Sequence, residues 1–157
     1  AQTWSDSLLV QVLVVCQHIG SNVTTEELSW VTSALEHDNE RVRKAAALAL
    51  GNLGWRRDLR STALVDRLLE DPAPRVRSAV YTMLARWGDE RALDQLADAL
   101  RTESDARARL AGTDALATQR DRFPGESTDA LDSTWRWSRE HVEFDRSARQ
   151  PDYVVSR

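Results

Sequence analysis

The chain has 157 residues, of which 41% are hydrophobic and 29% are charged. This composition is typical of a folded globular chain and argues against intrinsic disorder. The formal net charge of −4 disfavours a nucleic acid or an anionic membrane as the partner.

The first predicted helix covers residues 5–19 and contains the longest apolar run, from Leu8 to Cys16. This run is far shorter than the ~20 residues that span a bilayer, so no membrane partner is expected. Cys16 is the only cysteine, which excludes an internal disulfide and favours a reducing, cytoplasmic location. The β-branched residues of the run leave a strand as the competing interpretation.

The same helix has apolar residues on more than one face. A helical wheel puts Val10 and Val14 on the far side of the main apolar stripe, which consists of Leu8, Val12, Val15, Cys16 and Ile19, flanked by Leu9 and Leu13. We therefore expect this helix to pack against neighbouring repeats of a longer protein or against a second copy of the chain.

An internal repeat organises the residues that follow. Gly20, Gly54 and Gly88 are separated by 34 residues each, and Arg43 and Arg77 have the same spacing. In each unit the apolar positions recur at a helical period, and the glycine falls where it can end a helix. The pattern predicts two helices in each repeat.

The predicted helices fall into pairs. First helices are expected over residues 5–19, 40–53, 74–87 and 105–118, and second helices over 25–36, 59–70, 89–101 and 127–142. The units are then about 5–36, 40–70, 74–101 and 105–142, within one domain of residues 1–142 and a tail of residues 143–157. A single pair cannot bury its apolar face, so the pairs must stack.

The motif D-x-x-x-V-R-x-A-A-x-x-A-L-G-x-L-G, from Asp38 to Gly54, resembles the HEAT-like repeat, the type also seen in phycobilin-lyase relatives. The resemblance implies an all-α, right-handed α-solenoid of about four helix pairs. It also implies a ladder of ion pairs along the turns, formed by Asp38, Asp71 and Asp105 with Arg43, Arg77 and Arg109.

The sequence contains no motif of a catalytic or metal site. It lacks a Gly-rich phosphate loop, G-x-S-x-G, H-E-x-x-H and C-x-x-C. Deoxyhypusine hydroxylase, an iron enzyme built of HEAT-like repeats, uses His-Glu dipeptides as ligands, whereas this chain has Glu-His at 36–37 and 140–141. We therefore expect no catalytic residue, no metal and no cofactor.

Three groups of residues are candidates for partner binding. The second helices are acidic, and Asp66, Glu70, Asp94 and Asp98 form either an ordinary solvated face or a groove that attracts a basic partner. The predicted loop with Arg56, Arg57 and Arg60 either binds an anion or is simply solvated. Trp135 and Trp137 lie about 200° apart on a helix, since successive residues turn ~100°, so both are not expected to face one core.

The expected function is that of a non-catalytic scaffold or sensor module, within a larger protein or assembly, that binds a protein partner through its second helices. The alternative is an enzyme-like chain, since HEAT-like solenoids include bilin lyases and DNA alkylation-repair glycosylases. A glycosylase requires a basic groove, which the acidic second helices oppose. A purely structural, oligomer-building role is the third interpretation.

Overall fold

The structure is a computed structural model that describes residues 5–19, 25–53, 62–122, 132–133 and 135–140. The helices are α1 (Asp6–Ile19), α2 (Thr25–Ala34), α3 (Glu40–Asn52), α4 (Thr62–Leu69), α5 (Pro74–Trp87), α6 (Glu90–Thr102) and α7 (Ala106–Arg122). Residues 132–133 and 135–140 are also helical, and these ranges contain no strand. The prediction of an all-α chain is therefore confirmed for the described residues.

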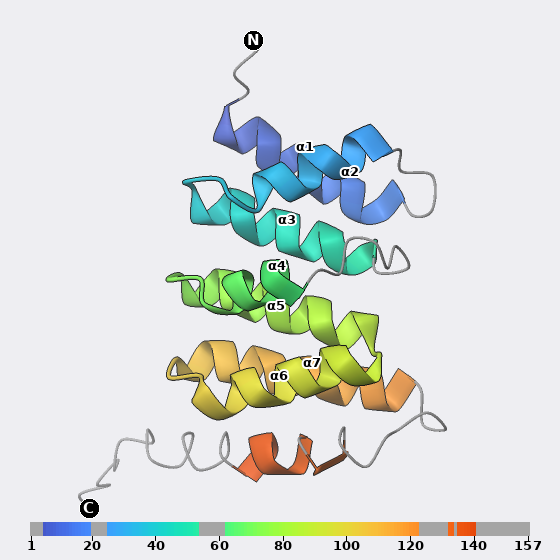
Figure 1. Cartoon of the computed structure of the whole chain (residues 1–157), viewed down its shortest axis with the longest axis vertical. Coiled ribbons are helices and arrows are strands. Elements are labelled where there is room, and N and C mark those ends of the chain that lie inside the picture. Colours follow the sequence, from blue (N-terminus) through green and yellow to red (C-terminus); the bar gives the residue numbers. More distant parts are fainter. Residues whose placement is uncertain (1–4, 20–24, 54–61, 123–131, 134, 141–157) are drawn as a thin grey trace, which may run out of the picture.

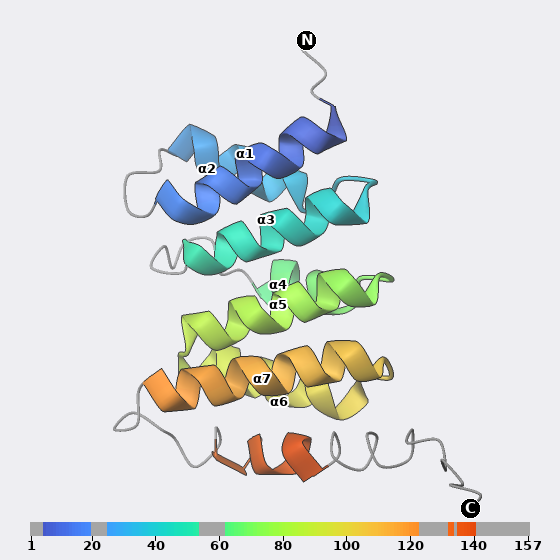
Figure 2. The ribbon, with the colours of Figure 1, turned by 180° about the vertical axis from the view of Figure 1, so that it is seen from behind.

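The helices form two layers, which Figures 1 and 2 show from opposite sides. The first-helix layer holds α1, α3, α5 and α7, which lie side by side in chain order. The second-helix layer holds α2, α4 and α6, and these pack against the helices of the first layer. None of the helices in the described ranges is long and apolar enough to cross a membrane.

The bounds of the first helices follow the repeat closely. The predicted starts at residues 40 and 74 and the predicted end at 87 are those of α3 and α5. The prediction for α7 was too short, because this helix continues to Arg122, two residues before Pro124. Nothing between 118 and 122 stops a helix, whereas a proline disfavours the helical conformation of the residue before it.

Side chains and one glycine fix several helix ends. The Asn39 side chain accepts a hydrogen bond from the Arg41 amide at 2.8 Å and begins α3. Asp89 accepts from the Ala92 amide at 2.9 Å and begins α6. Gly88 ends α5 with φ 64°, a left-handed conformation that glycine adopts without strain. Gly20 and Gly54 lie outside the described residues.

Small residues let the helices of the first layer approach closely. Ala46, Ala47 and Ala49 of α3 are fully buried, and a Cβ at Gly51 would lie 3.1 Å from Cα of Met83 on α5. The atom in the way belongs to the backbone, so it cannot move aside as the end of a flexible side chain can. Gly51 therefore sets the distance between α3 and α5 at this point.

Replacing Gly51 by valine is expected to lower the free energy of unfolding by about 2–3 kcal/mol, because the branched side chain overpacks the contact with Met83. Alanine is expected to cost less, since its better helix propensity of about 1 kcal/mol offsets part of the clash. Urea unfolding followed by circular dichroism measures both. A valine variant with the unfolding midpoint of the original chain would contradict this account of the helix contact.

The buried face of α1 differs from the predicted stripe. Leu13 is fully buried and Leu9 and Val12 are partly buried, whereas Leu8 and Val15 are 43% and 55% exposed. The apolar stripe of the helical wheel is therefore not the face that α1 buries against the rest of the described chain. Within the described residues α1 packs mainly on α3, and this one neighbour selects the face centred on Leu13.

Candidate functional site

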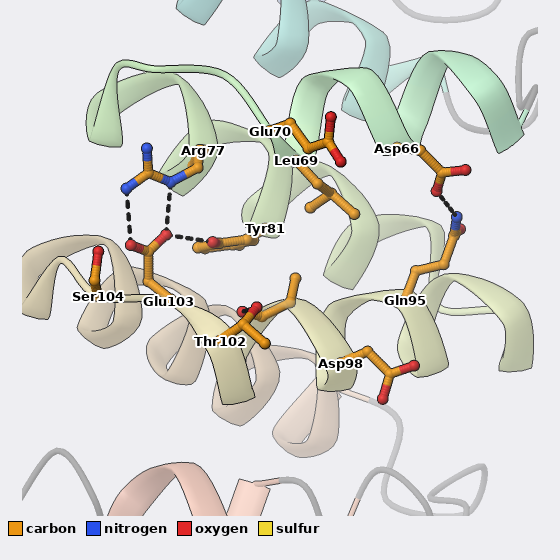
Figure 3. A pocket seen from close by; sticks show the side chains of 11 residues that line it. Asp66, Leu69, Glu70, Arg77, Tyr81, Gln95, Asp98, Thr102, Glu103 and Ser104 are labelled. Carbon is orange, nitrogen blue, oxygen red and sulfur yellow. Dashed lines mark hydrogen bonds and ion pairs between the residues drawn. The ribbon is translucent and has the colours of Figure 1, made fainter.

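A groove lies between α4 and α6 of the second-helix layer and reaches α5 of the first. Its volume is about 610 Å³. The residues that line it are Asp66, Leu69, Glu70, Arg77, Tyr81, Gln95, Asp98, Ala99, Thr102, Glu103 and Ser104. We call it the acidic groove. Figure 3 shows Asp66 and Glu70 on one side, Asp98 on the other, and Tyr81, Arg77 and Glu103 together at one end.

Three exposed carboxylates border the acidic groove, those of Asp66, Glu70 and Asp98. Asp66 accepts a hydrogen bond of 3.3 Å from Gln95 across the groove, which joins α4 to α6 (Figure 3). Asp98 forms an ion pair of 2.8 Å with Arg101 on its own helix, but its side chain is 81% exposed. Such exposed pairs contribute only about 0–1 kcal/mol, so Arg101 holds the Asp98 carboxylate only weakly.

At the end of the groove, the Glu103 carboxylate is held by several donors. Arg77 Nε donates to Oε2 and Nη2 donates to Oε1, both at 2.8 Å. The Tyr81 hydroxyl donates to Oε2, and the Asp105 amide donates to Oε1 at 2.7 Å. The Glu103 side chain is only 1% exposed. Both oxygens are thus occupied, which indicates a structural group and not a free catalytic carboxylate.

The pKa values agree with this interpretation. Burial alone raises the pKa of Glu103, but the hydrogen bonds from Arg77, Tyr81 and the Asp105 amide outweigh burial and lower it to about 2. Burial and the hydrogen bond to Glu103 raise the pKa of Tyr81. The hydrogen bond to Glu103 likewise raises the pKa of Arg77. Glu103 and Arg77 are therefore charged, and Tyr81 is protonated, near neutral pH.

A second bidentate pair lies one repeat earlier. Arg43 of α3 donates to both carboxylate oxygens of Asp71, from Nε at 2.7 Å and from Nη2 at 3.1 Å. This hydrogen bond to Asp71 raises the pKa of Arg43. Arg43 Nη1 also donates to the carbonyls of His37 and Asp38, at 2.8 Å each. The arginine therefore joins its own turn to the turn of the following repeat.

The two pairs form one hydrogen-bonded chain. Arg77 Nη1 donates to the Asp71 carbonyl at 2.8 Å, and Arg109 Nη2 donates to the Glu103 carbonyl at 2.6 Å. The bonds thus run from Arg43 through Asp71 and Arg77 to Glu103 and Arg109. We call these five residues the arginine relay.

A comparison of the sequence with known protein families bears on the type of repeat. The sequence pattern that defines HEAT repeats matches residues 52–117, which extend from the end of α3 through most of α7. Residues 52–117 have the sequence pattern of HEAT repeats. The resemblance found in the motif from Asp38 to Gly54 is thereby supported. No curated protein matches the chain. HEAT repeats commonly serve as scaffolds for protein interactions.

The predicted ladder differs from the observed one at two positions, Asp105 and Asp38. Asp105 was expected to pair with an arginine, but its carboxylate caps α7 by accepting from the amides of Arg107 and Ala108. Glu103 takes the expected position in the arginine relay. Asp38 contributes its carbonyl to Arg43, and no side-chain ion pair joins the two. The sequence spacing does fit the observed relay. Asp71 and Glu103 each precede an arginine, Arg77 and Arg109, by six residues.

The other candidate residues are not gathered at the acidic groove. Asp94 is exposed on α6 but does not line the groove. Trp135 and Trp137 are both partly buried against the hydrophobic core, so the expectation that only one faces it was wrong. The Trp135 ring also lies under the Arg139 guanidinium, 4.9 Å from its centroid.

The expectations about the anion-binding loop and the metal site depend on which residues the structure describes. Arg56, Arg57 and Arg60 lie outside them, so the anion-binding loop stays a prediction. Within the described ranges, no group of three or more His, Cys, Asp or Glu side chains is placed to hold a metal ion.

The sequence predicted only part of the acidic groove. Its acidic border was predicted from α4 and α6, but Leu69, Ala99 and Tyr81 were not assigned to it. Tyr81 comes from α5 in the other layer. The repeat gives no register between the layers, and this register decides which residue of α5 reaches the groove.

Proposed function

We propose that the chain is a non-catalytic protein-interaction module, part of a larger protein or assembly, that binds a basic segment of a partner protein in the acidic groove. The observation that carries this proposal is the placement of three exposed carboxylates, Asp66, Glu70 and Asp98, around one concave site. Interactions with oppositely charged residues give a site of this kind both specificity and a faster association.

The lining of the groove favours a peptide segment over a flat protein surface. Leu69 and Ala99 are only partly exposed and offer an apolar floor between the carboxylates. The long stem of an arginine or a lysine can lie on such a floor while its charged end reaches a carboxylate. Because both oxygens of Glu103 are already bonded, we assign the recognition of cations to Asp66, Glu70 and Asp98 alone.

The proposal extends to the handedness of the stack, the number of helix pairs and the location of the chain in the cell. We take the stack as a right-handed solenoid of four helix pairs, with α7 and the helical residues 132–133 and 135–140 as the fourth pair. The packing of Trp135 and Trp137 against the core supports this assignment. We also take the location as cytoplasmic, in keeping with the single cysteine.

A charge reversal tests the proposed function. The variant Asp66→Lys, Glu70→Lys, Asp98→Lys is expected to bind the basic partner about a hundredfold less tightly, because like charges placed together cost several kcal/mol. Affinity capture from host lysate, read by mass spectrometry, identifies the partner, and titration of that partner at several salt concentrations measures the loss. The affinity of the unmodified chain should fall as salt rises.

The matched control reverses three exposed carboxylates that do not line the groove, in Asp94→Lys, Asp114→Lys, Glu140→Lys. This control has the same net charge as the groove variant and should keep the partner. Circular dichroism checks that both variants fold. If both variants lose the partner equally, the loss of binding comes from the change in net charge alone. If both variants keep the partner, its binding site is not the acidic groove.

A further inference from the structure

A second groove lies on the first-helix layer, whose helices are nearest to the viewer in Figure 2. All of the residues that line it belong to α1, α3 and α5, and none to α2, α4 or α6. Its volume is about 380 Å³. It is therefore separate from the acidic groove and crosses three consecutive helices of one layer. We call it the basic groove.

The floor of the basic groove is aliphatic. Val10 and Val14 come from α1, and Ala45 and Leu48 come from α3. Val14 is 43% exposed although it is aliphatic. An exposed aliphatic side chain beside the other apolar residues of a hollow is typical of a binding surface.

Three cations surround this floor, Arg41 and Lys44 from α3 and Arg75 from α5. All three are exposed, and their charged groups form no hydrogen bond or ion pair within the part of the chain that the structure describes. Arg43 and Arg77 on the same two helices, by contrast, each hold a carboxylate. Glu40 is the one acidic residue among the described lining residues, so these residues together carry a net positive charge.

The basic residues of the first-helix layer lie on α3, α5 and α7, and α1 contains neither Lys nor Arg. The four helices of this layer carry ten Lys or Arg residues against four Asp or Glu, whereas the helices of the second layer carry three against six. The first-layer helices are therefore basic in sequence, in keeping with the three cations that line the groove.

We propose that the basic groove is a second docking site and that its occupant is an acidic amphipathic helix of a protein partner. Aliphatic side chains on one face of such a helix fill the floor between α1 and α3, and Asp or Glu residues beside them pair with Arg41, Lys44 and Arg75. Among the described residues, no aromatic side chain lines the groove, so these residues offer nucleic-acid bases no ring to stack on. This site does not depend on the acidic groove.

A displayed library of helical peptides, selected on the full chain, tests this assignment before the natural partner is identified. The enriched peptides that compete for the basic groove are expected to carry Leu, Ile or Val at helical spacing, with Asp or Glu beside them. They should bind the variant Lys44→Glu, Arg75→Glu at least about tenfold less tightly. The control Arg91→Glu, Arg136→Glu removes two exposed cations elsewhere and should bind as the original chain does.

Lys44 offers a direct check, because it is the only lysine in the sequence. A carbodiimide joins an amine to a carboxylate in contact with it, so an enriched peptide should become linked to Lys44 through its Asp or Glu. Failure to link a tightly bound peptide at Lys44 would contradict the assignment. The variant Lys44→Gln, Arg75→Gln repeats the binding test if charge reversal impairs folding.

Other results would overturn the proposal. Enriched peptides that are basic, or that bind the Lys44→Glu, Arg75→Glu variant unchanged, would place binding elsewhere, and no enrichment at all would leave the groove without this occupant. Vesicles of phosphatidylserine test whether the groove binds a membrane. If the chain binds these vesicles and the variant does not, the occupant is an anionic membrane surface and not a peptide. Peptides lost only through the Asp66, Glu70 and Asp98 variant belong to the acidic groove, so the two sites succeed or fail separately.

Discussion

Replacing Glu103 by alanine is expected to lower the free energy of unfolding by about 3–5 kcal/mol, the cost of removing one partner of a buried ion pair. The Glu103 side chain is 1% exposed and that of Arg77 is 16% exposed. Without the carboxylate, the Arg77 guanidinium, the Tyr81 hydroxyl and the Asp105 amide lose an acceptor together. Urea unfolding followed by circular dichroism measures the change.

Two further variants isolate the cause. Asp98→Ala removes the exposed pair with Arg101 and should change the free energy of unfolding by only about 0–1 kcal/mol. Tyr81→Phe removes a single donor to Glu103 and should cost about 1–3 kcal/mol, which keeps the test informative if the alanine variant does not fold. Equal effects of Glu103→Ala and Asp98→Ala would refute the structural role of Glu103.

Acid is expected to destabilise the chain through the same carboxylate. The pKa of Glu103 is about 2 in the folded chain against an ordinary value of 4.5. At a pH above the ordinary pKa, a lowered pKa in the folded chain stabilises the fold. This stabilisation is lost as the pH falls from about 4.5 towards 2. The difference between the two pKa values corresponds to about 3 kcal/mol.

The measurement compares free energies of unfolding for the original chain and Glu103→Gln over this pH range. Other carboxylates titrate there too, but they are common to both proteins, so the difference between the two curves isolates Glu103. The original chain should lose its advantage over the variant as the pH falls to about 2. Parallel curves would show that Glu103 does not titrate with a lowered pKa.

The sequence predicted the first-helix layer best because two signals agree there. The repeat of 34 residues sets the positions of α3 and α5, and a cap or a proline marks each start, Asn39 for α3 and Pro74 for α5. The face of α1 was not predictable in the same way. It has apolar residues on all sides, so only its packing on α3 shows that Leu13 is central.

The site was harder to predict because it depends on pairing between elements. Glu103 and Asp105 lie two residues apart in one turn, and either carboxylate has the chemistry to bind Arg77. The choice follows from the start of α7, where an Asp at the cap position accepts from the free amides and leaves Glu103 for the arginine. The acidic groove likewise needed the register of α5 against α6 to bring Tyr81 to its end.

The arginine relay has a mechanical consequence. Its bonds connect the turns in series, from the Arg43–Asp71 pair to the Arg77–Glu103 pair by way of the Asp71 carbonyl. When the stack is stretched along its long axis, tension at this edge passes through every link, and the weakest link decides where the edge opens. The bond from Arg77 to the Asp71 carbonyl lies within one turn, whereas the two ion pairs join successive repeats, so we expect repeats to part where an ion pair breaks. Optical tweezers would locate this step by a lower rupture force in a variant that weakens it. The chain would then stretch by parting whole repeats while each helix pair stays folded.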